Sequence, residues 1–160
     1  STPGFVNLMS HNRIKLLNRF LHFNSNPCPR NSSKKLHKIK PIFEYLVKRF
    51  SEVYTPKQDL SIDESLLLRK GRLSFKQFIR IKRARFGIKT YILSEAKSGY
   101  IWKMVVYVGK ETNILENRNY GHATIVILTL VEDLLDKGYC IYADNFYCSP
   151  QAAIALSERN

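Results

Sequence analysis

The pattern of hydrophobic and polar positions begins with a helix. Ile14, Leu17 and Leu21 recur at intervals of three and four, the spacing that places side chains on one face of a helix. Ser10 precedes them and can accept a hydrogen bond from the first helical turn. The helix is expected to end before Asn24, where a proline-containing loop begins. It could present basic residues to a partner or pack as a small helix on the core, and the pattern favours packing.

A second stripe with helical spacing runs from Leu36 to Phe50. Pro41 lies within it, and proline removes a backbone hydrogen bond from the interior of a helix. The helix therefore either kinks at Pro41 or begins there, and we favour a start near Pro41. Its apolar side is expected to cover the sheet that follows. Residues 1–53 are thus predicted to form a helical lead-in.

Three segments between residues 60 and 108 have the composition or the alternation of apolar and polar positions that is typical of β-strands. The first strand is expected over residues 60–68. Two more are expected over 88–94 and 100–108, joined by a short hairpin turn that contains a glycine. Glu64 breaks the alternation on the apolar face of the first strand. Because an unpaired buried carboxylate is costly, Glu64 needs a partner, and we expect a nearby Arg or Lys.

One more helix and strand follow in the last third of the chain. An apolar stripe from Ile127 to Leu135 predicts a helix that stops at Gly138. Residues 139–143 show no polar alternation, as expected of a strand covered on both faces. Asp144 follows at the carboxyl end of that strand, which is where open α/β sheets bind ligands. The dipeptide Ser149-Pro150 then begins a last helix.

The net charge indicates the class of partner. The chain of 160 residues has 26 Lys and Arg against 13 Asp and Glu, a net charge of +13, which favours a polyanion through steering and counterion release. No apolar run approaches the roughly 18 residues of a membrane-spanning helix, so no membrane partner is expected. Three cysteines without a CxxC pair predict neither disulfides nor a zinc site. Cys140 and Cys148 are expected to be small buried apolar groups.

Basic residues are concentrated between Arg69 and Lys89, and no acidic residue occurs from Ser65 to Ser94. Phenylalanines are interleaved with them, as in segments that bury apolar weight while presenting cations to phosphates. The run could be a solvated loop or a nuclear-import patch, and its position after an acidic strand favours nucleic-acid contact. We expect the protein in the nucleus. The candidate DNA-binding residues are Arg69, Lys70, Arg72, Lys76, Arg80, Lys82, Arg83, Arg85 and Lys89.

The element order matches a known fold. Three antiparallel strands, then a helix and a parallel strand, form the order of a ribonuclease H-like sheet, here after an N-terminal helical lead-in. The predicted class is therefore α/β (α+β mixed). Residues 54–160 would be the N-terminal portion of such a catalytic domain. The domain would be truncated at its C-terminus, because its last strand and helix have no counterpart in the sequence.

Short motifs occur in a shared order over nearly the whole of this second region. They are Tyr54-Thr55-Pro56, Leu60-Ser61-Ile62-Asp63-Glu64, Lys70-Gly71-Arg72, Phe86-Gly87-Ile88-Lys89, Ser98-Gly99-Tyr100, Val106-Tyr107-Val108-Gly109-Lys110 and Tyr142-Ala143-Asp144-Asn145-Phe146-Tyr147. Together they resemble the piggyBac transposase family, and the helix that follows Met9-Ser10 resembles the all-helical lead-in of that family.

The resemblance implies a DNA transposase in which three aspartates hold two divalent metal ions. Asp63 and Asp144 match the first and second aspartates, and the third lies beyond this chain. Mg²⁺ prefers carboxylate oxygens, and two such ions can activate an attacking hydroxyl and stabilise the leaving oxygen. Asp63 and Asp144 are thus the expected catalytic residues and metal ligands, with Mg²⁺ as cofactor and DNA as partner. A homodimer of the full-length parent is left open.

Three functions follow from this sequence. In the first, the chain is part of a piggyBac-like transposase, supplies two of three carboxylates for phosphodiester hydrolysis and strand transfer, and by itself binds DNA without cutting it. In the second, it is a domesticated, transposase-derived DNA-binding or scaffold protein without catalysis. Lys82-Arg83 supports that alternative, because the family has Lys-Pro at this step. The third is a basic RNA-binding α/β domain.

Overall fold

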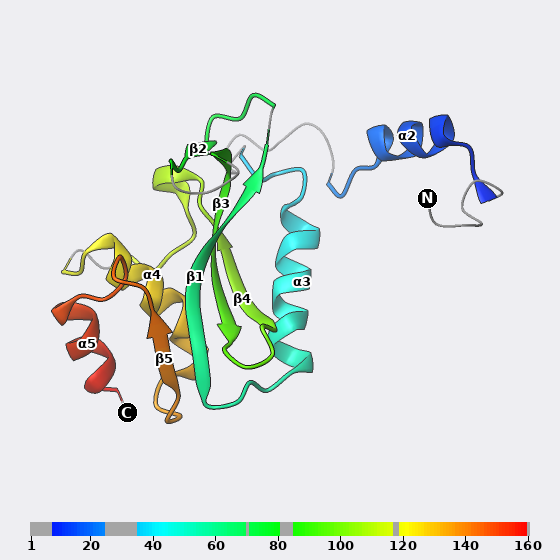
Figure 1. The fold of residues 1–160 in the computed structure, drawn as a ribbon. Coiled ribbons are helices and arrows are strands. Elements are labelled where there is room, and N and C mark those ends of the chain that lie inside the picture. Colours follow the sequence, from blue (N-terminus) through cyan, green and yellow to red (C-terminus); the bar gives the residue numbers. More distant parts are fainter. Residues whose placement is uncertain (1–7, 25–34, 70, 81–84, 117–118, 160) are drawn as a thin grey trace. The chain divides into compact units, whose positions relative to one another are not determined.

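The computed structural model describes residues 8–24, 35–69, 71–80, 85–116 and 119–159. The chain divides into two compact units, Ser1–Glu44 and Tyr45–Asn160, and each is described by itself (Figure 1). The predicted domain boundary after residue 53 stays a prediction.

The first unit contains helix α2, His11–Phe20, and the start of helix α3, Lys40–Val53. The side chain of Ser10 accepts a hydrogen bond from the backbone N–H of Arg13, which confirms the expected N-cap. α3 begins one residue before Pro41, close to the favoured start. Proline is tolerated there because the first N–H groups of a helix have no intrahelical partner.

α3 does not cover the sheet as expected. None of its residues is buried, and Tyr45 and Leu46 are exposed. Residues 45–53 of α3 belong to the second unit, and there the Phe50 ring meets the Tyr100 ring edge-on. The Tyr100 hydroxyl also donates to the Phe50 carbonyl over 3.0 Å. Helical periodicity therefore identified the helix, but not what it packs against.

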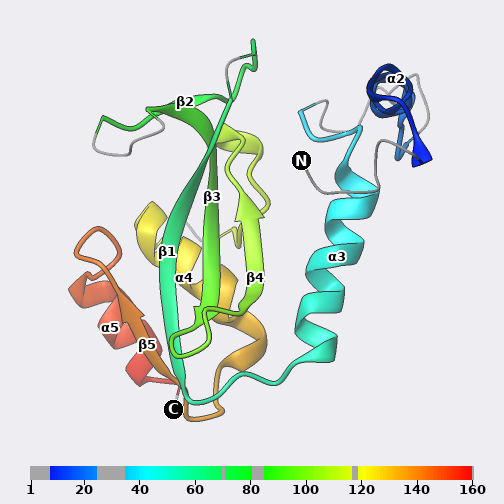
Figure 2. The same ribbon diagram turned by 45° about the vertical axis from the view of Figure 1, so that its right-hand side comes forward.

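The second unit is built on a mixed five-stranded sheet (Figure 2). Its strands are β1 Asp59–Leu68, β2 Gln77–Phe78, β3 Phe86–Glu95, β4 Ile101–Val106 and β5 Cys140–Ala143. β1 pairs antiparallel with β3 and parallel with β5, while both β2 and β4 pair antiparallel with β3. The three antiparallel strands and the later parallel strand are as predicted. The short strand β2 was not expected.

Helices cover one side of this sheet. They are α4 His122–Val131, followed by the short 3-10 helix η2 Glu132–Leu134, and α5 Pro150–Ser157. α4 contacts β3, β4 and α5. Leu60, Leu93 and Leu130 are fully buried in the resulting core. Burying each such side chain stabilises the fold by about 1.5–3 kcal/mol. The expected cap of α5 is confirmed, because Ser149 accepts from the Ala152 N–H and Pro150 is the first helical residue.

A buried carboxylate fixes the end of the sheet opposite β2. Glu95 is 1% exposed and accepts hydrogen bonds from the Tyr54 hydroxyl, the Lys57 N–H and the Ser98 hydroxyl. These donors come from the connector before β1 and from the β3–β4 turn. The Ser98 hydrogen bond, then the Lys57 N–H, lowers the pKa of Glu95. The charged carboxylate therefore ties two loops together.

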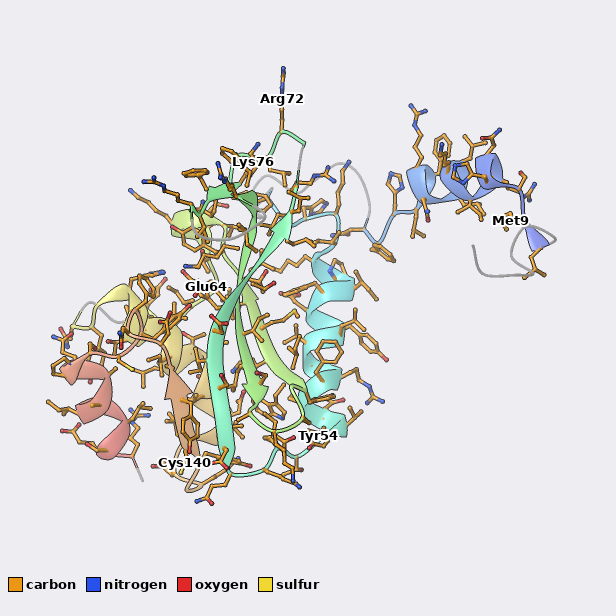
Figure 3. The ribbon with its side chains drawn as sticks, in the orientation of Figure 1. Met9, Tyr54, Glu64, Arg72, Lys76 and Cys140 are labelled. Atoms are coloured by element: carbon orange, nitrogen blue, oxygen red, sulfur yellow. The ribbon has the colours of Figure 1, made fainter. Side chains whose placement is uncertain are left out.

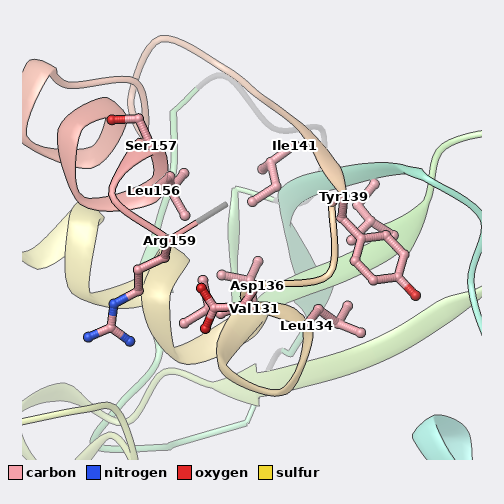
Figure 4. Close-up of a pocket in the computed structure, with 11 residues that line it drawn as sticks. Val131, Leu134, Asp136, Tyr139, Ile141, Leu156, Ser157 and Arg159 are labelled. Carbon is pink, nitrogen blue, oxygen red and sulfur yellow. The ribbon is translucent and has the colours of Figure 1, made fainter.

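A hollow of about 190 Å³ lies beside β5 (Figure 4). The apolar side chains of Val131, Leu134, Ile141 and Leu156 line it. Within the described chain β5 pairs with β1 alone, so its outer edge is open. Cys140 and Cys148 are exposed, and the expectation that both are buried is therefore wrong. None of the helices in the described ranges is both long and apolar enough to cross a membrane.

Candidate metal and DNA site

The parallel pairing of β1 with β5 brings the two predicted aspartates together. Ile62 pairs with Ala143, and the next positions along the two strands are Asp63 and Asp144. Adjacent strands lie about 4.8 Å apart, and partners in a parallel register point to the same face of the sheet. Both aspartates are exposed. The register, continued by one residue beyond β5, therefore places Asp63 and Asp144 at neighbouring positions on adjacent segments of the chain.

Local backbone hydrogen bonds hold each of these carboxylates. Asp63 Oδ1 accepts from the Glu64 N–H over 2.7 Å, and Asp144 Oδ1 accepts from the Phe146 N–H over 2.8 Å. The Asp144 carbonyl also accepts from the N–H groups of Tyr147 and Cys148, which closes a turn after β5. Among the described residues, Oδ2 of neither aspartate meets a hydrogen-bond donor. One oxygen of each carboxylate is therefore available to a ligand.

Glu64 faces the opposite side of β1 from Asp63. It lies near the middle of the strand (Figure 3), is half-buried, and accepts a hydrogen bond of 3.1 Å from the Tyr147 hydroxyl. Tyr147 is fully buried. A tyrosine hydroxyl thus meets the carboxylate for which an Arg or Lys was expected, and an additional basic partner stays a prediction. This bond joins β1 to the turn that carries Asp144.

Aromatic residues surround this contact. Tyr91, opposite Glu64 on β3, packs edge-on against Tyr147 and shares a hydrogen bond of 2.9 Å with His122 at the start of α4. Burial, then Tyr107 and Glu64, raises the pKa of Tyr91 to about 12. Burial, then Glu64, also raises the pKa of Tyr147. Both hydroxyls therefore keep their protons at neutral pH, and Tyr147 remains a donor to Glu64.

The exposed face that carries Asp63 is hollowed into a shallow cavity of about 460 Å³. Asp63, Ser65, Ile92 and Ser94 line it. The cavity extends over β1, β3 and the start of β4, so Asp63 borders an open surface that a large ligand can approach.

The predicted DNA-binding segment lies at the end of the sheet that carries β2, opposite the end that carries Glu95. Arg69, Arg72, Arg80 and Arg85 are exposed, and Lys76 and Lys89 are half-buried. Arg72 and Lys76 project from the end that carries β2 (Figure 3). Lys70, Lys82 and Arg83 lie outside the described residues.

The side chain of Lys89, on β3, approaches the turn that carries Asp144. Its Nζ lies 4.9 Å from the Tyr91 ring centroid and 5.1 Å from that of Phe146, which precedes Tyr147. Lys89, together with burial, lowers the pKa of His122, burial being the larger cause. The basic segment therefore reaches the Asp144 turn through the contact of Lys89 with Phe146.

The sequence did not identify Tyr147 or Phe146 as contributors to this site. Tyr147 is 83 positions from Glu64, so no local pattern could pair them. The sequence does contain one signal for them: two consecutive aromatic residues, Phe146 and Tyr147, closely follow Asp144 in a segment that would otherwise be expected to be polar.

A divalent metal fits the donors that this site offers. The available Oδ2 atoms of Asp63 and Asp144 are hard oxygen donors on one face, which suits Mg²⁺. Cys140 and Cys148 are exposed nearby in sequence, but thiolates suit softer metals. In the described part of the chain, no three His, Cys, Asp or Glu side chains gather into a metal-binding cluster. These residues would therefore supply two carboxylate ligands.

Comparison with known proteins identifies the family. The sequence model of the family described as transposase IS4 matches residues 1–160. PiggyBac transposable element-derived protein 3 of Homo sapiens is 30% identical over 118 residues, which cover 72% of this chain and 20% of that protein. The human chimeric ERCC6-PGBD3 protein is equally similar over 72% of this chain and 11% of its own length.

A solved structure shares the fold. The cryo-EM structure of a piggyBac transposase synaptic complex with hairpin DNA matches with a TM-score of 0.86 and 23% identity, over 95% of this chain and 32% of that one. The chain thus spans a third or less of each of these proteins. The match confirms the predicted ribonuclease H-like α/β architecture. The chain belongs to the transposase IS4 family and, within it, to the group that comprises piggyBac transposases and the proteins derived from them.

Proposed function

We propose that this chain supplies part of the DNA-binding surface and two metal-ligand aspartates of a Mg²⁺-dependent, piggyBac-type DNA transposase. The single observation that carries this proposal is the register of β1 and β5, which continues from Ile62 and Ala143 to Asp63 and Asp144. Two carboxylates at adjacent positions of neighbouring strands give no mutual stabilisation, since like charges repel, whereas a bound cation would interact favourably with both. Such a pair therefore suits a metal site better than a purely structural role.

The residues of the chain have separable tasks in this proposal. Asp63 and Asp144 would hold the cation, while the Glu64 and Phe146 N–H groups orient the two carboxylates through Oδ1. A bound Mg²⁺ would supply Lewis-acid stabilisation of charge on a phosphodiester. The exposed arginines at the β2 end contact phosphates and position the DNA. The transposase acts in the nucleus, and the full-length parent works as a homodimer.

Metal binding tests the carboxylate pair directly. Mn²⁺ binding to the purified chain, followed by the loss of the free-ion EPR signal, is expected to weaken by about tenfold or more in Asp63→Asn and in Asp144→Asn. Asp59→Asn is the matched control, because Asp59 is also an exposed aspartate on β1 and pairs with Cys140 rather than with an aspartate. Equal Mn²⁺ affinity in all three variants and the wild type would refute the metal site.

DNA binding and cleavage are measured separately. We expect the purified chain to bind a terminal-repeat duplex in the presence of Mg²⁺ and not to cut it, because two carboxylates are fewer than the family uses. Strand cutting that Asp63→Ala abolishes would contradict this expectation and assign catalysis to the chain itself. Single-stranded RNA that competes as well as the duplex, with a shallow salt dependence, would favour a general RNA-binding domain.

One observation favours a second function, a transposase-derived binding protein without catalysis. The human relative that is 30% identical is named as transposable element-derived. In that case DNA binding is retained and the Asp63 and Asp144 variants bind Mn²⁺ as weakly as the wild type. The Mn²⁺ titration therefore also separates these two functions.

A further inference from the structure

An exposed aromatic pair lies within the basic segment. Phe78 of β2 and Phe86 of β3 are cross-strand partners, with ring centroids 4.7 Å apart and ring planes at 41°. Phe78 is 56% exposed and Phe86 is 50% exposed. Two large apolar side chains that meet on the surface, rather than in the core, indicate a surface that binds something.

The backbone holds this pair in place from both sides. The Arg69 N–H donates to the Phe86 carbonyl over 3.2 Å, and the Ile79 N–H donates to the Arg85 carbonyl over 2.9 Å. β2 on one side and the end of β1 on the other thus fix the position of Phe86. A ring on a hydrogen-bonded strand loses little conformational freedom when a ligand stacks on it.

The surroundings of the two rings are cationic. Lys76 Nζ lies 5.3 Å from the centroid of the Phe86 ring, and Arg80 and Arg85 flank the pair along the chain and are exposed. The sequence contains no acidic residue from Ser65 to Ser94. An apolar protein partner would have to desolvate these charges. A nucleic acid satisfies both features, because its phosphates meet the cations and its bases have flat aromatic faces.

We propose that Phe78 and Phe86 form a stacking platform for unpaired bases of single-stranded DNA, such as those at an opened or processed DNA end. Bases in an intact duplex are stacked on one another and do not present their faces. The pair therefore discriminates between paired and unpaired DNA, while the arginines bind both. The proposal rests on the proposed DNA-binding function and adds to it the structure of the DNA that this surface takes.

The test compares two DNA probes by fluorescence anisotropy, a labelled oligothymidine and a blunt duplex of mixed sequence, with the whole chain. Phe78→Leu and Phe86→Leu are each expected to weaken oligothymidine binding by about tenfold, the scale of one lost base stack. Duplex affinity is expected to change less than about twofold, since the phosphate contacts stay. Tyr45→Leu on α3 is the matched control, an exposed aromatic residue outside the basic segment, and should change neither affinity.

A change in the DNA keeps the test independent of protein folding. Replacing the thymidines by abasic sites removes the bases and keeps the phosphates, so the wild type should lose about tenfold or more in affinity and the Phe78→Leu/Phe86→Leu double variant should lose little. Phe78→Tyr and Phe86→Tyr should retain the preference, because tyrosine also stacks.

The outcomes separate this inference from the function on which it rests. A wild type that binds duplex and abasic DNA as tightly as oligothymidine overturns the platform and leaves DNA binding intact. Leucine variants that weaken both probes by the same factor also overturn it. A wild type that binds neither probe at low salt refutes the DNA-binding function together with the platform.

Discussion

The hydroxyl of Tyr147 donates a hydrogen bond of 3.1 Å to the carboxylate of Glu64, and this bond connects strand β1, which carries Asp63, to the turn that carries Asp144. Each partner is next to, or three residues from, one of the aspartates along the chain. Because Tyr147 is fully buried, its ring cannot move without disturbing the core. The bond therefore helps to hold the Asp144 turn against β1.

Removing the Tyr147 hydroxyl should reduce metal affinity strongly and lower the stability of the fold only slightly. Tyr147→Phe keeps the ring and is expected to lower the free energy of unfolding by about 1 kcal/mol, the net value of one hydrogen bond. Mn²⁺ affinity should fall by about tenfold, as when a group that orients metal ligands is removed. Tyr107→Phe, in the same aromatic cluster, is the control for both measurements. Equal losses of Mn²⁺ affinity in the two variants would contradict a positioning role for Tyr147.

The basic segment predicts a graded salt dependence of DNA binding. Arg72→Gln and Arg80→Gln should each remove one phosphate contact and reduce the slope of log affinity against log salt by about 0.9. Both arginines are exposed, so stability should hardly change. Arg49→Gln is a suitable control, because Arg49 is already paired with Glu52 on α3 over 2.8 Å. A slope that the Arg72 and Arg80 variants leave unaltered would exclude these residues from the DNA surface.

Glu95 predicts an acid-sensitive contribution to stability. Its pKa is lowered from the usual 4.5 by the Ser98 hydrogen bond first and the Lys57 N–H second. A lowered folded-state pKa means that the contribution is fully present above pH 4.5 and is lost as the pH falls through the folded-state value. Glu95→Gln should therefore be less stable than the wild type at about pH 7, and the difference should shrink towards about pH 3. Chemical denaturation at several pH values measures it, and a gap that stays constant would argue against a charged Glu95.

At Gly87, where β1, β2 and β3 meet, the close backbone leaves no room for a side chain. A Cβ at this position would lie 2.3 Å from the carbonyl oxygen of Leu67, so the β1–β3 pairing would have to shift. Gly87→Ala is expected to destabilise the protein by about 1–3 kcal/mol, the usual cost of overpacking. Gly121→Ser adds a side chain where nothing lies within 4 Å, at the N-cap of α4, and should be neutral or slightly stabilising. Thermal unfolding of both variants provides the comparison.

Much of the fold was predictable because its signals are local. Ser10, Pro41 and Ser149-Pro150 mark helix starts through their own backbone chemistry, and the alternation over β1, β3 and β4 needs no distant partner. The extent of burial was less predictable. Residues 139–143 show no polar alternation and were expected to form a strand covered on both faces, but exposure alternates along β5, with Cys140 and Tyr142 on the exposed face. A sequence pattern can predict a strand, but it does not show which faces of that strand other elements cover.

In the candidate site, too, some residues could be predicted from local sequence signals and others could not. Asp63 and Asp144 could be selected by their strand positions and by family resemblance, and their roles as ligands stay a prediction. Tyr147 and the Phe78–Phe86 pair depend on contacts between separate strands and turns. The two-residue strand β2 is too short to give a period, so nothing in the sequence could predict that Phe78 would face Phe86.

The parallel register of β1 and β5 also restricts how the length of this protein can change. Side chains alternate between the faces of a strand, so one residue inserted or deleted between Gly138 and Asp144 would turn the second aspartate away from the first. A change of the same size in the polar stretch between η1, Gly109–Glu111, and α4 would leave the pair together. Relatives that keep the carboxylate pair should therefore vary in length in that stretch and keep a constant length between the glycine and the aspartate.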